Sequence, residues 1–319
     1  MAFALRLYDG CPVSGSATAV RPRARAVDRL PPVSFFLVSA VFHYLGPAFA
    51  VLLFAHVDVL GVAWLRIAAA AVVLAAWRRP WRLVRRLSPA RRRLLLGLGS
   101  VLAAMNSLFY LAIDRLPLST VGAVEFLGVV VLAAAGTRTR RNLLALVLAV
   151  GGVAALTDVR IAGEPLGFLF AFANCAGFML YVVLGHRIAT TTTTTDAGGD
   201  VRGPLDGIDQ LAAAMVVAAV VATPLGIAAA VPAFTHPDWL LWGIGVGVCS
   251  SVIPYVTDQL AMARMRRATF ALMLAILPAT ATVIGLLVLR QTPTAQDAAG
   301  IALVAVGVAL RDEAASRRR

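Results

Sequence analysis

The sequence predicts an all-α membrane protein, with ten transmembrane helices arranged as two inverted five-helix repeats and with both termini in the cytoplasm. Composition, apolar segments and the distribution of arginine lead to this prediction. Of the 319 residues, 60% are hydrophobic and only 14% are charged, and the mean hydropathy is +0.84. A soluble domain of this length needs more polar residues to cover its surface. The expected solvent of this chain is therefore a lipid bilayer.

Ten apolar segments meet or approach the roughly 20 residues that cross a bilayer core. In chain order they are 33–54, 58–77, 94–113, 118–135, 143–157, 165–185, 208–231, 239–262, 269–289 and 297–310. The fifth and tenth segments are short and contain Gly151, Gly152 and Gly307. Small residues let helix backbones approach closely. These two helices are therefore predicted to make helix–helix contacts, and a homodimer through them is one candidate contact.

Arginine sets the predicted orientation, because all 29 basic residues are arginine. With the N-terminus inside, the cytoplasmic segments hold 25 arginines and the outer loops hold only Arg115, Arg160 and Arg290. Basic residues are enriched in cytoplasmic loops, so this asymmetry places both termini in the cytoplasm. The arginines also form short clusters between apolar runs rather than one basic groove, which argues against nucleic-acid binding.

An internal repeat is visible in the sequence. Residues 111–115 match 260–264 at an offset of 149, and residues 148–151 match 304–307 at an offset of 156. The matched pieces belong to spans three to five and eight to ten, so the repeat unit has five helices. A unit with an odd number of helices inverts when it repeats. Inverted repeats place the substrate of a transporter near the membrane midplane, between the two halves.

Polar and basic stretches set the predicted domain boundaries. Residues 1–32 are predicted to be a disordered, arginine-rich cytoplasmic tail. The first repeat is predicted at 33–157 and the second at 165–311, and 312–319 form a basic C-terminal tail. Within the second repeat, 189–207 read as a polar loop rich in Thr, Asp, Gly and Pro.

A charged residue within a membrane span costs roughly 2.5–3.5 kcal/mol, and three of those in the predicted spans are candidates for function. Glu125, eight residues into the fourth span, is predicted to contact a substrate amine or to carry a coupled proton; the alternative is a protonated or Arg-paired structural role. Arg66 either binds a substrate carboxylate or neutralises Glu125. Asp258, near the inner end of the eighth span, either belongs to the pathway or pairs with Arg264.

Uncharged polar residues form three pairs, each on one face of a span. The pairs are Asn106 with Tyr110, Tyr255 with Gln259, and Asn174 with Tyr181. The first two pairs correspond under the offset of 149, as expected for polar faces that line one central cavity. The alternative is that these residues hydrogen-bond between helices and only hold them together.

Prolines within the spans are candidate hinges, since they free backbone carbonyls and permit bending. The three candidates are Pro47, Pro254 and Pro278.

No enzyme motif or metal-binding spacing is present, and neither a cofactor nor catalytic residues are predicted. The sequence has no H-E-x-x-H, G-x-S-x-G or Walker loop. Cys11, Cys175 and Cys249 share no paired spacing. Without a nucleotide-binding domain, transport is expected to be driven by a gradient. The predicted partners are a small-molecule substrate and the lipid bilayer.

Several motifs occur in order along the chain: Pro-Trp-Arg at 80–82, Met-Asn-Ser-Leu-Phe-Tyr-Leu at 105–111, Leu-Pro-Leu at 116–118 and Glu-Phe-Leu-Gly at 125–128. Together they resemble the EamA group of the drug/metabolite transporter superfamily, and within it the branch of threonine/homoserine exporters. The resemblance covers residues 33–311. It implies a ten-helix inverted-repeat fold with a central cavity in the bacterial cytoplasmic membrane, and efflux of amino acids or related metabolites by proton antiport.

By this resemblance, the positions expected to lie on the transport pathway are Asn106, Tyr110, Glu125, Tyr255 and Asp258.

Two positions depart from the family pattern. Val129 stands where the family has proline, and Leu277 stands where an acidic residue precedes the proline. The missing acidic residue leaves the substrate and the coupling stoichiometry open.

The leading prediction is a secondary transporter that exports a small metabolite, an amino acid such as threonine or homoserine, by proton-coupled alternating access. In it, Arg66 binds the substrate carboxylate, and Glu125 binds the amine or carries the proton. An alternative is efflux of hydrophobic cations or drugs, because a buried carboxylate near Phe109, Tyr110 and Phe126 suits a cation. An alternative of another class is a non-transporting membrane scaffold or receptor, whose arginine clusters hold anionic lipid or a partner.

Overall fold

The described part of the chain is helical. The computed structural model describes residues 31–136, 139–158, 164–193, 205–265, 273–274 and 276–310, and none of these is in a β-strand. In chain order the helices are α1 (Pro32–Leu53), α2 (Val59–Arg78), α3 (Trp81–Arg86), α4 (Pro89–Ile113), α5 (Leu118–Gly136), α6 (Arg140–Asp158), α7 (Pro165–Thr193), α8 (Leu205–Thr235), α9 (Pro237–Gly247), the π-helix η2 (Val248–Val252), α10 (Ile253–Arg264), α12 (Ile276–Leu289) and α13 (Ala295–Leu310).

Several helices are long and apolar enough to cross a membrane. By length and composition, six described helical stretches qualify: Pro32–Leu53, Val59–Arg78, Pro89–Ile113, Pro165–Gly185, Gly207–Thr235 and Pro237–Asp258. Shorter apolar helices cover Leu118–Leu132, Ile276–Leu289 and Ala295–Leu310. The outer surface agrees with a lipid environment, because large apolar side chains such as Val72, Leu241 and Leu287 are 68–71% exposed.

Proline and short polar side chains determine where several helices begin. α1, α4, α7 and α9 each start at a proline, whose missing N–H costs nothing in the first turn. α2 follows Asp58, whose Oδ1 accepts a hydrogen bond from the N–H of Leu60 at 2.9 Å. α2 ends at Arg79, which adopts the left-handed conformation with φ of 50°.

Two helix boundaries differ from the predicted ones. α7 continues to Thr193 and α8 begins at Leu205, so both ends of the predicted polar loop 189–207 are helical. Adding a residue to an existing helix costs far less than nucleating a new one, so the first threonines extend α7. α4 starts at Pro89, ahead of its apolar run, because Ser88 caps it.

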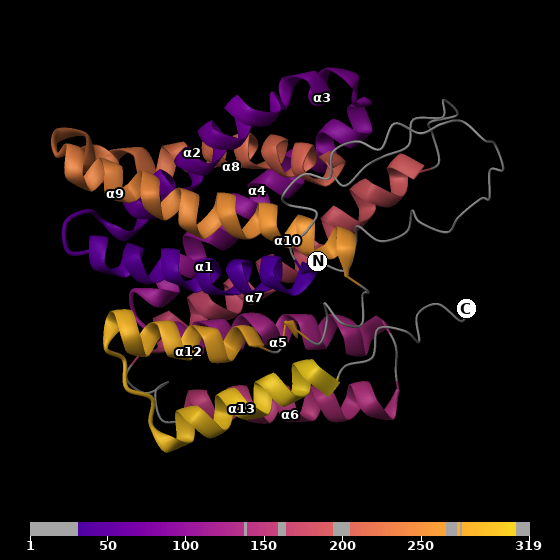
Figure 1. The fold of residues 1–319 in the computed structure, drawn as a ribbon, viewed down its shortest axis with the longest axis vertical. Helices are drawn as coiled ribbons and strands as arrows, with labels where there is room; N and C mark the ends of the chain where they lie inside the picture. Colours follow the sequence, from indigo (N-terminus) through magenta and orange to yellow (C-terminus); the bar gives the residue numbers. More distant parts are fainter. Residues whose placement is uncertain are drawn as a thin grey trace.

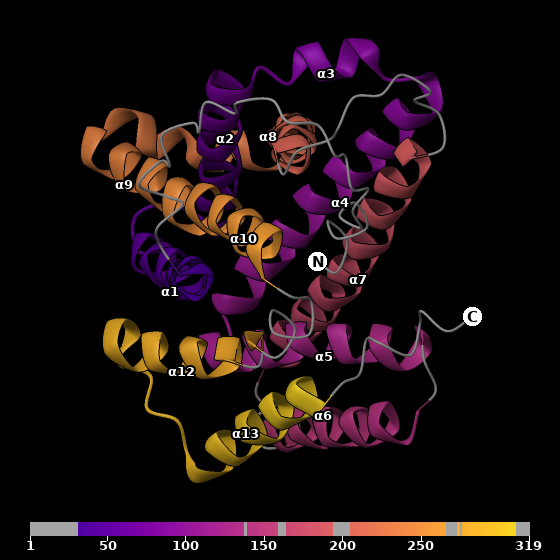
Figure 2. The same ribbon diagram turned by 45° about the vertical axis from the view of Figure 1, so that its right-hand side comes forward.

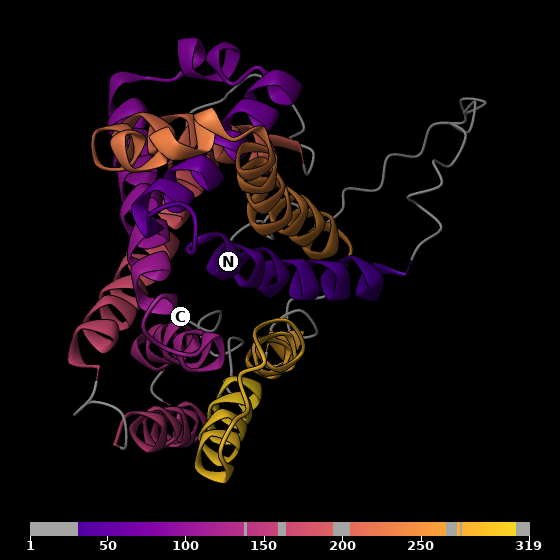
Figure 3. The same cartoon turned by 90° about the vertical axis from the view of Figure 1, so that its left-hand side faces the viewer.

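The helices lie side by side, stacked along the long axis of the molecule (Figure 1). α6 and α13 pair at one end, and α2 and α8 pair towards the other end, near the short α3 (Figure 2). Between these pairs, α4 packs along α7, and α1 packs against both α10 and α12. In Figure 3, α1 (indigo) accordingly lies between the orange α9–α10 segment and the yellow α12. α5 contacts α6, α7, α12 and α13.

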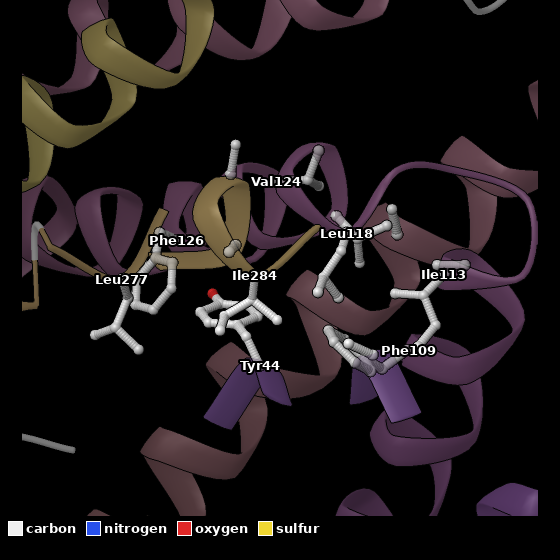
Figure 4. Close-up of a cluster of buried hydrophobic side chains, with 14 of the residues drawn as sticks. Tyr44, Phe109, Ile113, Leu118, Val124, Phe126, Leu277 and Ile284 are labelled. Carbon is white, nitrogen blue, oxygen red and sulfur yellow. The ribbon is translucent and has the colours of Figure 1, made fainter. Parts of the chain in front are cut away.

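Buried apolar side chains form two clusters. The smaller one joins α2, α4 and α8 through residues such as Ile67, Leu102 and Met215. The larger one surrounds α1, α5, α12 and α13. Figure 4 shows part of this larger cluster, in which Tyr44 of α1 lies among apolar side chains from α4, α5 and α12. The Tyr44 ring is thus packed among apolar side chains of three other helices.

The fifth and tenth predicted spans contact each other within the chain, as α6 and α13. A Cβ atom at Gly152 would lie 2.5 Å from the carbonyl oxygen of Gly300, and one at Gly307 would lie 2.7 Å from that of Ala145. Neighbouring Gly151 has nothing within 4 Å of such a Cβ position. The glycines on one face are therefore needed for the pairing of α6 with α13. A homodimer through the remaining faces stays a prediction.

We expect Gly152→Ala and Gly151→Ala to have opposite effects on stability. The first methyl group would collide with α13 and should lower the free energy of unfolding by about 1–3 kcal/mol. The second points into open space and should gain up to about 1 kcal/mol of helix propensity. Thermal unfolding of the two purified variants in detergent checks this, and equal midpoints would contradict the packing described.

Candidate functional site

A charged arginine is buried partway along α2. Arg66 is the eighth residue of this helix and is only 6% exposed. Its Nε donates a hydrogen bond to Ser251 Oγ (3.0 Å), and its Nη2 donates to the carbonyl oxygen of Ser250 (3.2 Å). Its Cζ lies 5.2 Å from the ring centroid of Tyr110, a cation–π distance. Within the described ranges Arg66 forms no ion pair, so neutral oxygens and an aromatic face surround its charge.

The acceptors for Arg66 belong to an irregular turn that Pro254 explains. In a regular α-helix the Ser250 carbonyl would accept from the N–H of residue 254, but proline has no N–H. The chain forms the π-helix η2 at this point, between α9 and α10. Gly46 of α1 packs onto the turn, where a Cβ atom would lie 2.7 Å from Ser250 N. The freed carbonyl is therefore held between α1 and α2, and Arg66 bonds to it.

The three predicted hinge prolines occupy different settings. Pro254 is the second residue of α10, which follows the π-helix, and its carbonyl accepts a hydrogen bond from Ser39 Oγ at 3.3 Å. Pro47 lies inside α1, which is continuous through it. Pro278 is in the first turn of α12, where it does not interrupt the described helix because that turn needs no N–H donors. Pro254 is thus the proline at a helix irregularity, and hinge motion stays a prediction for all three.

A small cavity between α1, α5, α7, α10 and the region before α12 holds two carboxylates. Glu125, the eighth residue of α5, and Asp258 of α10 both line it, and each is 7% exposed. Ser39 and His43 of α1 are its other polar lining residues. The remaining walls are apolar: Phe36, Ala40, Phe126, Phe178, Leu274 and Leu277. The cavity combines acidic groups with aromatic and aliphatic walls.

Buried polar atoms without hydrogen-bond partners concentrate where α1, α4, α5, α7 and η2 meet. Among the described residues these atoms are Tyr44 Oη, Tyr110 Oη, Thr120 Oγ1, Glu125 Oε2, both side-chain polar atoms of Asn174, and Ser250 Oγ. Folded proteins leave few buried polar groups unpaired, so each such group calls for an explanation. Their concentration beside two carboxylates and a buried arginine indicates a binding region.

The predicted polar pairs take different places around this region. Tyr110 contacts Arg66, and Asn174 lies beside Glu125. Asn106 is buried, and its Nδ2 donates to the Leu102 carbonyl of its own helix at 2.7 Å. Its amide therefore has one partner that is unrelated to any ligand.

The remaining pairs belong to the side of the region nearest Asp258. Tyr181 of α7 lies close to Tyr255 and Asp258, and Asn106 lies close to Tyr255. Gln259 belongs to α10, but its side chain lies outside the described residues. The residues chosen from the sequence are thus brought together, while their role in a pathway stays a prediction.

Two structural alternatives weighed from the sequence do not occur as direct ion pairs. Asp258 is not paired with Arg264, whose Cζ lies instead 5.0 Å from the ring centroid of Phe35. Arg66 and Glu125 also form no ion pair, although each carries a charge at similar depth in its helix. Both statements concern the described residues, and they leave Arg66, Glu125 and Asp258 available to a ligand.

Sequence reasoning missed the polar groups contributed by small residues. Ser250 and Ser251 hold Arg66, and Ser39 lines the acidic cavity. His43, also of α1, lines the cavity too. One signal was available: Pro254 four residues after Ser250 predicts a free carbonyl at that serine.

Comparison with known proteins gives one family. The sequence profile of the EamA-like transporter family matches residues 166–311. The chain is 32% identical over 263 residues to the threonine/homoserine exporter RhtA of Salmonella typhimurium (strain SL1344), covering 82% of this chain and 85% of the relative. It is 31% identical to the protein of that name from Escherichia coli (strain K12), with the same coverage. One crystal structure, 19% identical, matches with a TM-score of 0.52 over 87% of this chain and 96% of that one, which shows a shared fold.

Proposed function

The chain belongs to the EamA-like transporter family and is a membrane exporter, and we propose that it exports an amino acid such as threonine or homoserine by proton-coupled alternating access. The transport machinery in this proposal is the region around Arg66, Glu125 and Asp258. The substrate's carboxylate is bound at Arg66, and its ammonium group is bound in the acidic cavity.

One observation carries this proposal: charges of both signs are buried in the helices without forming ion pairs with each other among the described residues. A buried unpaired charge is expensive, and removing one partner of a buried pair typically costs 3–5 kcal/mol. Charged residues that stay buried without a partner are expected where they bind a charged ligand. A zwitterionic amino acid supplies the missing partner to Arg66 and to Glu125 at once.

Alternating access would bring the two proposed binding groups, Arg66 and the acidic cavity, to one substrate. Arg66 is not among the residues that line the acidic cavity, and it is bonded to the π-helix instead. In the proposed cycle, α2 and η2 shift against α5, so that one substrate contacts Arg66 and the carboxylates of the acidic cavity together. Glu125 and Asp258 supply two carboxylates, so one can bind the ammonium group while the other carries the exchanged proton.

The helix contacts support the two inverted five-helix repeats. In these repeats, each helix of the first half corresponds to one of the second half: α1 to α7, α2 to α8, α4 to α9–α10, α5 to α12 and α6 to α13. A two-fold axis that relates the halves then makes the contact of α4 with α7 equivalent to the contact of α10 with α1. The same axis makes the contact of α5 with α7 equivalent to the contact of α12 with α1. It passes through the contacts between corresponding helices, which are α2 with α8, α5 with α12 and α6 with α13. All these contacts occur. The family profile, at 166–311, spans the predicted second repeat. The arginine distribution supports ten spans with both termini in the cytoplasm.

Efflux of hydrophobic cations is a second candidate, and the composition of the cavity favours it. Two carboxylates and three phenylalanines line this cavity, and no arginine is among the described residues that line it. Such a lining resembles a site for an organic cation, in which ring faces and carboxylates both attract positive charge.

Growth protection separates the two candidates. Expression in a bacterial host that lacks its own exporters should protect the cells against excess homoserine or a toxic threonine analogue, and should not protect against a lipophilic cation. The negative control is the Glu125→Gln variant expressed at the same level, which should give no protection because it lacks the proposed coupling carboxylate. Protection against the cation alone would favour the second candidate over the amino-acid exporter.

A further inference from the structure

Three buried hydrogen-bond donors converge beside the π-helix. They are the guanidinium of Arg66 and the hydroxyls of Tyr110 and Ser250, from residues that are 6%, 0% and 1% exposed. The Tyr110 hydroxyl lies near both the Ser250 side chain and Arg66. Neither hydroxyl oxygen has a hydrogen-bond partner of good geometry among the described residues. The group therefore offers donors from three helical segments, and two of them are buried hydroxyls without a partner among the described residues.

One acceptor already bound to Arg66 indicates which kind of ligand fits. Nη2 bonds to the carbonyl oxygen of Ser250, which is free because Pro254 lacks the N–H that would otherwise occupy it. A backbone carbonyl thus stands in the place of an anionic oxygen. A carboxylate is a stronger acceptor for guanidinium than a neutral carbonyl, and its two oxygens match the planar fork of arginine.

We propose that Arg66, Tyr110 and Ser250 form the binding site for the carboxylate of the transported metabolite, and that a free carboxylate is therefore required for transport. This inference rests on the proposed function, and it adds Tyr110 and Ser250 as ligands of the substrate. The Arg66 guanidinium binds the carboxylate oxygens, and the two hydroxyls donate to the remaining lone pairs. The site excludes amines that lack a carboxylate, which the acidic cavity alone would accept.

The test is competition against counterflow of labelled homoserine in proteoliposomes that contain the full chain. The competitors are two matched pairs: homoserine with homoserine lactone, and threonine with threonine amide. Each pair keeps the amine and differs at the carboxyl group. For the wild-type protein we expect the free acids to compete at concentrations at least about 30-fold lower than the lactone or the amide, since a charge-assisted contact is lost.

Single hydroxyl deletions test the two added ligands. Tyr110→Phe and Ser250→Ala should each raise the half-inhibitory concentration of threonine by roughly tenfold and leave that of threonine amide unchanged. Ser107→Ala is the matched control, because its hydroxyl bonds to the Ala103 carbonyl of its own helix, and it should change neither value. Size-exclusion profiles of all variants verify that they fold.

Three outcomes are distinguishable. Equal competition by acid and amide in a protein that transports homoserine would overturn the carboxylate site and leave the exporter standing. A parallel change for acid and amide in Tyr110→Phe and Ser250→Ala would likewise overturn their role as carboxylate ligands. Absence of any amino-acid flux in the wild-type protein would overturn the proposed function, and the site's role with it.

Discussion

Glu125→Gln is expected to reduce proton-driven export of homoserine by about 100-fold and to abolish its response to a pH gradient. Glu125 is buried on α5 and lines the acidic cavity, and its Oε2 has no hydrogen-bond partner among the described residues. Glutamine keeps the shape and size of the side chain but neither binds an ammonium ion as a charge nor exchanges a proton. Losing one partner of a buried charge pair costs about 3 kcal/mol, which corresponds to the factor of 100.

The stability of Glu125→Gln should not fall with its export activity. Removing a buried charge that has no protein partner relieves desolvation, so the free energy of unfolding of Glu125→Gln should equal or exceed that of the wild-type protein. Glu164→Gln is the matched control, because Glu164 is exposed directly before α7, and this variant should export at the wild-type rate. Wild-type flux and wild-type pH dependence in Glu125→Gln would show that another group carries the coupling.

Arg66→Lys is expected to reduce export at least about 30-fold although it preserves the charge. The guanidinium bonds to Ser251 Oγ through Nε and to the Ser250 carbonyl through Nη2. A lysine has one nitrogen on a flexible stem, and it cannot hold both acceptors and a carboxylate in one plane. Each lost hydrogen bond to a charged group costs about 1.5–3 kcal/mol. Both the flux and the thermal midpoint should therefore fall.

The control for this second substitution is Arg78→Lys. Arg78, at the end of α2, pairs with Asp209 of α8, and both side chains are partly exposed. Ion pairs in such positions contribute about 0–1 kcal/mol, so flux and midpoint should change little. If Arg66→Lys behaved like Arg78→Lys, the buried arginine would have no special role in binding.

The helices and the charged residues of the site were predictable because their signals are local. An apolar run of about 20 residues needs no tertiary information, and a charge in its middle stands out against it. Arg66, Glu125 and Asp258 were found in this way, and all three are buried. The glycines of α6 and α13 predicted close helix contacts, since small residues mark close packing, but the sequence did not show that these two helices pair with each other within the chain.

The parts that escaped prediction depend on residues far apart in the chain. Arg66 and Ser251 are separated by 185 positions in the chain. Neither a serine nor a π-helix gives a signal of its own in the hydropathy of the sequence. The acidic cavity exists because α1 lies between α10 and α12, so Ser39 and His43 meet Asp258 only in the folded protein. The polar loop was placed too long because threonine-rich ends of a helix look like a linker in composition.

The central claim is that this chain exports an amino acid by exchange with protons, and flux in proteoliposomes with an imposed pH gradient tests it most directly. The panel consists of labelled threonine, homoserine and other amino acids, together with one lipophilic cation. The account predicts counterflow of threonine or homoserine that accelerates when the gradient drives protons in the opposite direction. Transport of the cation alone, or amino-acid flux that ignores the gradient, would contradict it.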